Sequence, residues 1–288
     1  MTLWTLLAEQ PAYFITLATV LGLLVGSFIN VVVYRLPVML ERQWQREAQE
    51  VLGLPTREHA RFDLCLPASR CPHCGHAIRA WENIPVLSYL ALRGRCSACK
   101  QPISSRYPLV EVSCALLSMM VAWYCGAGAQ ALALLVFTWC LLALSLIDHD
   151  QQILPDVLVL PTLWLGLVVN AFDTVVSLPD ALWGAVAGYL SLWTVYWVFK
   201  LLTGKEGMGY GDFKLLALIG AWGGWQVLPI TLMLSSVVGV VGGLVLLRLR
   251  RQSVGTAIPF GPYLAIAGWI AVLWGDEMYA SYLQLLGF

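Results

Sequence analysis

Eight apolar stretches, most of them long enough to cross a membrane, dominate this chain of 288 residues. A helix needs about 20 mostly apolar residues to span the hydrocarbon core of a bilayer. Only 12% of the residues are charged, against about 25% in ordinary globular domains. The sequence therefore predicts an all-α polytopic membrane protein with about eight transmembrane helices. The expected spans are residues 12–34, 108–125, 130–147, 155–172, 181–202, 212–224 (the short one), 227–249 and 258–275.

Positive charges predict the orientation of these spans. Residues 35–107 hold 11 of the 17 Lys and Arg, and such an excess marks the cytoplasmic side of a membrane protein. With both termini outside the cytoplasm, all 17 fall in inner segments or at inner helix ends. No basic residue precedes the first stretch, so we expect a retained span and no signal peptide. The formal net charge is zero, so we expect no nucleic-acid partner.

The same pattern predicts three parts: a first transmembrane helix (1–34), a cytoplasmic domain (35–107) and a seven-helix membrane domain (108–288). In the first helix, Gly22 and Gly26 are spaced as small residues at helix contacts often are. Packing is the favoured interpretation of this pair and of the polar Asn30, and a substrate contact at Asn30 is the alternative.

Two C-x₂-C pairs in the cytoplasmic domain predict a metal site. Cys71-Pro-His-Cys74 and Cys96-Ser-Ala-Cys99 have close to the spacing of a Cys₄ zinc site. An apolar residue follows each pair at the same offset, as in a pseudo-symmetric zinc ribbon. Four thiolates leave no open coordination position, so we expect a structural zinc ion. Redox-active or merely reduced cysteines are the alternative. We expect His73, His76 and the other four cysteines not to bind metal.

Acidic residues in or beside a span are costly to place and so suggest function. Asp148 ends the third expected span and Asp212 begins the sixth, both at the cytoplasmic side. Two carboxylates held together share a proton, and they can then act as general base and general acid. For each aspartate a helix cap or loop residue is the alternative. Glu111 lies one turn inside the second span, with Arg106 as a possible partner.

Three glycines precede Asp212, at Gly207, Gly209 and Gly211. We expect them to form an active-site loop, because glycine permits close approach of a substrate strand or unusual backbone angles. Non-helical backbone at this depth is tolerated where it lines a water-filled cavity.

Together these motifs resemble the bacterial type IV prepilin peptidases, and the resemblance covers essentially the whole chain. It rests on Gly209-Tyr-Gly-Asp212, on Asp148, on the two cysteine pairs and on three further stretches. These stretches are Gly26-Ser-Phe-Ile-Asn30, Trp81-Glu-Asn-Ile-Pro-Val-Leu-Ser88 and Ser105-Arg-Tyr-Pro-Leu-Val-Glu111. Gly-x-Gly-Asp alone is less specific, since presenilin-like intramembrane proteases share it.

The resemblance implies that Asp148 and Asp212 are the catalytic aspartates and that Cys71, Cys74, Cys96 and Cys99 bind zinc. It also implies a multi-pass enzyme of the bacterial inner membrane with periplasmic termini. Its substrates would be type IV prepilins and type II secretion pseudopilins. The basic leader would be cleaved after a glycine, and the new N-terminal residue, usually Phe, would be methylated from S-adenosylmethionine.

The residues themselves reveal no methyl-donor site, since no Rossmann glycine motif follows a strand. Arg93-Gly94-Arg95 is a candidate turn for a carboxylate-bearing cofactor, and a solvated basic turn near anionic lipid is the favoured alternative. Two other functions are considered. One is a proton- or cation-coupled transporter, although no inverted repeat is evident. The other is a non-catalytic assembly factor.

Overall fold

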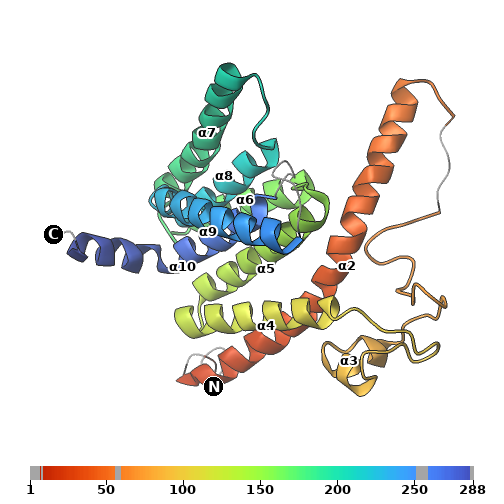
Figure 1. Cartoon of the computed structure of the whole chain (residues 1–288). Coiled ribbons are helices and arrows are strands. Elements are labelled where there is room, and N and C mark those ends of the chain that lie inside the picture. Colours follow the sequence, from red (N-terminus) through yellow and green to blue (C-terminus); the bar gives the residue numbers. More distant parts are fainter. Residues whose placement is uncertain (1–6, 8, 56–59, 251–258, 286–288) are drawn as a thin grey trace. The chain divides into compact units, whose positions relative to one another are not determined.

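The structure is a computed structural model that describes residues 7, 9–55, 60–250 and 259–285 (Figure 1). Within these ranges it is helical, and the only β-pairing is two isolated bridges. The chain forms two compact units, residues 1–135 and 136–288. The longer helices are α2 (Pro11–Val51), α4 (Arg106–Cys125), α5 (Ala129–Gln151), α6 (Asp156–Asn170), α7 (Leu178–Thr203), α8 (Tyr210–Gly223), α9 (Val227–Arg250) and α10 (Gly261–Leu285).

Each of the eight expected spans coincides with one of these helices, so the prediction of an all-α polytopic membrane protein is confirmed. α2, α4, α5 and α7 are long and apolar enough to cross a membrane. Shorter apolar helices lie at Asp156–Asn170, Val227–Val241 and Gly261–Gly275. α8 has 14 residues, in line with the short sixth stretch. The start of the last expected span, residue 258, lies outside the described residues.

α2 extends well beyond the first predicted span. It runs without interruption for 41 residues and contains Pro37, a residue that often breaks a helix interior. The polar segment 41–50 is the continuation of the same helix. It ends at Val51, just before Gly53, which has a positive φ of 64°.

Small residues bring α2 and α4 into close contact in the first unit. A Cβ atom on Gly22 would lie 2.6 Å from Oγ of Ser118, and one on Gly26 would lie 2.8 Å from Cα of Glu111. The amide of Asn30 donates to the carbonyl oxygen of Tyr107 at 3.2 Å. The packing interpretation of this polar and glycine-rich face is therefore confirmed.

In the second unit, α8 is the buried central helix. Nearly every residue from Asp212 to Gly223 is buried. Gly184 and Gly188 of α7 allow its backbone to approach, because a Cβ on Gly188 would lie 2.7 Å from the carbonyl oxygen of Leu216. The indole nitrogen of Trp222 donates to the carbonyl oxygen of Thr162 in α6 at 2.9 Å. These contacts hold α8 in place, and with it the first turn that carries Asp212.

Asn170 links α6 to the far end of α8. Its side chain is fully buried, and its amide nitrogen donates to the carbonyl oxygens of Ala221 (3.0 Å) and Trp222 (3.2 Å). Its amide oxygen accepts from the N–H groups of Val175 (3.1 Å) and Val176 (3.2 Å). One side chain therefore satisfies four backbone groups where water is scarce.

We predict that Asn170→Ala lowers the free energy of unfolding by about 2–4 kcal/mol, because it removes hydrogen bonds to four backbone groups. Thermal unfolding of the detergent-solubilised protein would report this as a lower midpoint. Thr194→Ala is the matched control, since Thr194 is exposed and bonds only within its own helix. An unchanged midpoint for Asn170→Ala would contradict the assigned role.

Candidate functional site

The two candidate aspartates lie in the second unit, each at the end of a helix. Asp148 is in the last turn of α5 and Asp212 in the first turn of α8. Both are buried, with 6% and 8% of their surface exposed. Their carboxylates are near enough to interact electrostatically, although the residues are 64 positions apart in the sequence. The structure therefore brings together the two carboxylates that the sequence singled out.

The carboxylate of Asp148 is held by the start of α10. Its Oδ2 atom accepts a buried hydrogen bond of 3.0 Å from the N–H of Gly261. A Cβ atom on Gly261 would lie 2.6 Å from the same oxygen, so a glycine is needed for this approach. Asp148 therefore does act as a helix cap, as the alternative interpretation proposed, but it caps the first turn of α10 and not its own helix. Asp212 lies in the first turn of its own helix, where a carboxylate complements the helix dipole.

Gly261 is a site residue that sequence reasoning missed. The available signal was a glycine between two prolines, Pro259-Phe-Gly-Pro262, at the start of an apolar stretch. That pattern predicts a turn before a helix. It gives no hint that the turn meets Asp148, 113 residues earlier in the chain.

The glycine-rich loop before Asp212 is built for close packing. A Cβ on Gly207 would lie 2.8 Å from the ring of Phe199, and one on Gly211 would lie 2.9 Å from Cβ of Leu154. Gly209 caps α8 and has open space around its Cα. None of the three has a positive φ. Unusual backbone angles therefore do not explain these glycines. Gly207 and Gly211 allow close approach of this chain's own side chains, and the approach of a substrate strand stays a prediction.

A polar network holds the same loop to the end of α7. The ammonium group of Lys200 donates to Glu206 Oε1 at 2.8 Å and to the hydroxyl of Tyr196 at 3.2 Å. The Tyr196 ring packs against those of Tyr210 and Phe213, the neighbours of Asp212 in α8. Sequence reasoning also missed this set, because a lysine near a helix end is ordinary at a membrane surface.

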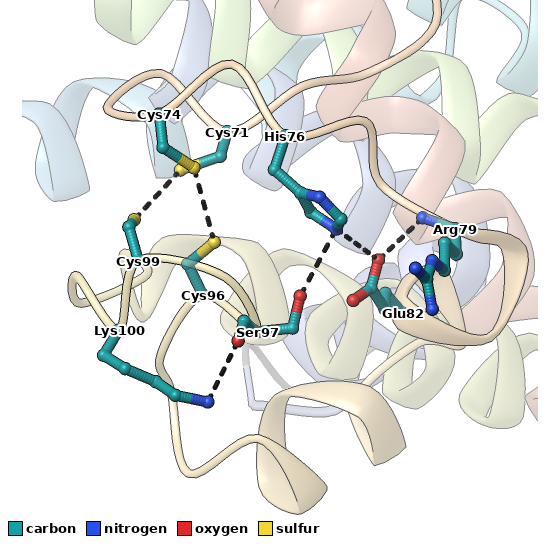
Figure 2. A network of polar contacts seen from close by, with 9 residues as sticks. All are labelled: Cys71, Cys74, His76, Arg79, Glu82, Cys96, Ser97, Cys99 and Lys100. Atoms are coloured by element: carbon teal, nitrogen blue, oxygen red, sulfur yellow. Dashed lines mark hydrogen bonds and ion pairs between the residues drawn. The ribbon is translucent and has the colours of Figure 1, made fainter.

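The four predicted metal ligands converge in the first unit (Figure 2). Their sulfur atoms all lie within 4.8 Å of one another. Sγ of Cys71 is 3.8 Å from that of Cys99, and Sγ of Cys74 is 4.0 Å from that of Cys96. A tetrahedral zinc ion with bonds of about 2.3 Å needs sulfur separations of about 3.8 Å. The cluster therefore fits a zinc ion.

The two knuckles repeat one backbone pattern. Cys71 N–H donates to His76, and Cys96 N–H donates to Gln101, both at 2.9 Å. Gly75 and Lys100, each just after the second cysteine of its pair, have positive φ values of 71° and 61°. The pseudo-symmetry expected of a zinc ribbon thus extends to the backbone angles.

Backbone N–H groups favour the thiolate form at the first cysteine of each pair. Those of Cys74 and His73 lower the pKa of Cys71 to about 7, and the pKa of Cys96 is also lowered. The N–H of His76 acts in the same way on Cys74, but burial and the neighbouring thiols raise the pKa of Cys74 to about 11. Four sulfurs this close need a cation before all of them can carry charge.

His76 lies beside the cluster with its ring turned to other partners (Figure 2). Its Nε2 atom is 3.3 Å from both Glu82 Oε2 and Ser97 Oγ. This contact links the first knuckle to η1 (Ala80–Asn83) and to the second knuckle. The arrangement supports the expectation that His76 is not a metal ligand.

The candidate cofactor turn lies in the first unit, between α3 (Leu87–Ala91) and the second knuckle. Arg93 and Arg95 are exposed. Gly94 has a φ of 67°, and a Cβ there would lie 2.9 Å from the hydroxyl of Tyr89. Gly94 therefore has a structural reason of its own to be glycine.

We predict that the purified protein carries about one zinc ion per chain and that Cys71→Ser or Cys96→Ser removes it. The reason is that each substitution leaves three thiolates for a site that needs four. Elemental analysis after extensive dialysis measures the metal. Cys65→Ser is the control, because Cys65 is an exposed cysteine outside the cluster. Metal-free wild-type protein with a disulfide among these cysteines would instead favour the redox alternative.

Comparison with known proteins gives a consistent result along the chain. The model of the bacterial peptidase A24 N-terminal domain matches residues 20–125, and that of the type IV leader peptidase family matches residues 135–244. No solved structure matches.

Among the relatives, a protein of Pseudomonas putida is 80% identical over the full length of both chains. One of Pseudomonas aeruginosa is 63% identical over the full length of both. A third, from Aeromonas hydrophila, is 56% identical over 95% of each. All three are named prepilin leader peptidase/N-methyltransferase. At this level of identity, and with family models matched in both halves, the chain belongs to the type IV leader peptidase family.

Proposed function

We propose that this chain removes the leader peptide of type IV prepilins and type II secretion pseudopilins and then methylates the exposed N-terminal residue. Its relatives are named for these two activities. The observation that carries the peptidase half is the pair Asp148 and Asp212, two buried carboxylates that interact within one unit.

The two carboxylates suit hydrolysis of a peptide bond. Two acids held close together share a proton, so one acts as general base on a water molecule and the other as general acid on the leaving amine. The shared proton belongs to the pair and is not assigned to either residue. The N–H of Gly261 fixes one oxygen of Asp148, which leaves the other oxygen of that carboxylate for the water or the substrate.

The charge pattern supports a location for the reaction. We propose that residues 35–107 and the catalytic pair face the cytoplasm of a bacterial cell, with both termini in the periplasm. All 17 Lys and Arg then lie on the inner side. A basic leader held in the cytoplasm would reach the pair directly. The division into a first membrane helix (1–34), a zinc domain (35–107) and a peptidase domain (108–288) stays a prediction about the function of each part. The two compact units of the structure divide at another place, near residue 135.

The methyltransferase half needs a donor, which we propose to be S-adenosylmethionine. When bound, this cofactor supplies an electrophilic methyl group. The Arg93-Gly94-Arg95 turn offers two exposed guanidinium groups, which suit a carboxylate. We propose zinc at the cysteine cluster as the structural ion that holds this turn, since Arg95 directly precedes the ligand Cys96.

We predict that Asp148→Asn and Asp212→Asn each lower the cleavage rate by at least about 100-fold, the contribution usual for a general acid or base. Purified prepilin and detergent-solubilised protein would be mixed, and the products followed by mass spectrometry. Asp150→Asn is the control, because Asp150 lies in the same helix but is exposed. We expect it to keep most of the activity.

Both substituted enzymes should still methylate a pilin that has already been cleaved, if the methyl-transfer site is separate. Wild-type cleavage by either variant would rule out the carboxylate pair and would revive the transporter hypothesis. A protein that never cleaves prepilin in any form would favour the assembly factor.

A further prediction concerns the cofactor turn. Arg93→Gln and Arg95→Gln should raise the S-adenosylmethionine concentration needed for half-maximal methylation, while prepilin cleavage and zinc content stay at wild-type levels. These variants are better tests than Gly94→Val, because a branched residue would be strained at this positive φ. Unchanged methylation in the double variant would remove the turn from the cofactor site. Arg70→Gln, at an exposed position before the first knuckle, is the control.

A further inference from the structure

Four large apolar side chains that are close together in the sequence are exposed just before the second zinc knuckle. Trp81, Ile84, Leu87 and Leu90 expose 50%, 45%, 65% and 64% of their surface; we call these four the apolar loop face. Leu87 and Leu90 are three residues apart in α3 and therefore share one side of that helix. Soluble proteins seldom leave such a group uncovered.

The depth of this face is fixed by a hydrogen bond to α4. The carboxylate of Glu111 accepts from the N–H of Val86 at 2.8 Å and also bonds the hydroxyl of Ser27 in α2. Val86 has a φ of 58°, a conformation that is unfavourable for a β-branched residue, so the contact holds this backbone in an unusual shape.

The place of Glu111 along α4 indicates how deep this contact lies in the membrane. Its 20 residues are about 30 Å long, which is about the thickness of the hydrocarbon core. Glu111 is the sixth residue, so its Cα lies roughly 7–8 Å along the helix from Arg106. Val86, bonded to this side chain, is therefore at the level of the first turns of a membrane helix. Figure 1 shows α3 next to this end of α4.

The charge beside the face fits the same position. Arg79 directly precedes η1 and is exposed. A short amphipathic segment with an arginine at its edge is typical of structures that lie in the headgroup region, with apolar side chains in the acyl chains and the guanidinium group at a lipid phosphate.

We propose that residues 81–92 form an interfacial anchor. In this arrangement the apolar loop face is buried in the bilayer leaflet where α4 begins, and anionic phospholipid is its partner. The anchor fixes the height of the second zinc knuckle above the membrane, because Cys96 follows α3 by only five residues. The proposal does not depend on the peptidase or methyltransferase activity.

Photo-crosslinking in the full-length protein tests the proposal. A photoreactive phenylalanine analogue would replace Leu87 or Leu90, and the protein would be placed in vesicles of phosphatidylglycerol and phosphatidylethanolamine. Leu52 is the matched control. It is an apolar residue with 70% of its surface exposed, at the far end of α2, roughly 25 Å along the helix from Arg35. Wild-type zinc content would show that each variant is folded.

We expect illumination to add the mass of one phospholipid to the protein carrying the analogue at position 87 or 90, and to add none at position 52. Crosslinks from 87 and 90 to peptides of residues 136–288 would mean that the second unit covers the face, and would overturn the proposal. So would crosslinks to added prepilin in place of lipid. Equal lipid labelling at 52 and 90 would also overturn it, since the labelling would then be nonspecific.

Discussion

Hydrocarbon offers no water to backbone N–H and C=O groups, and this constraint underlies every part of the structure. It makes the apolar stretches helical, and it requires that any break between helices be satisfied by side chains or buried backbone. Asn170 does this at the end of α6, where it bonds four backbone groups. Gly261 and Asp148 do it at the start of α10. The candidate catalytic carboxylate thus also helps to satisfy a helix terminus.

The sequence was most informative where a local pattern determines the structure. Hydropathy located the eight helices, and cysteine spacing identified a cluster whose sulfurs converge. It was less informative about the end of the first helix. Pro37 lies two residues after Arg35 at the membrane border, and the change from apolar to polar composition there resembled a boundary. The helix continues to Val51, because proline removes only one backbone N–H and most of the polar residues that follow favour helix.

Contacts between distant segments could not be predicted from one sequence. The approach of Asp148 to Asp212 was inferred from shared depth, which leaves the distance and orientation of the side chains open. The N–H of Gly261 on Asp148 and the Lys200 network on the glycine loop had no usable signal. The glycines before Asp212 illustrate the same limit. Their spacing suggested unusual backbone angles, but the reason for glycine at two of them is a neighbouring side chain.

The length of α2 has a geometric consequence for everything between it and α4. From Arg35 to Val51 the helix rises about 24 Å, and the chain must cover that distance again before α4 can start. The buried guanidinium of Arg35 donates to the carbonyl oxygens of Asp63 (2.9 Å) and Pro67 (2.7 Å). Residues 63–67 therefore lie beside Arg35, and the chain has returned to that end of the polar part of α2 before the first knuckle begins. The zinc-binding segment is thus joined to a membrane helix at each of its two ends, and both attachments limit how far it can move.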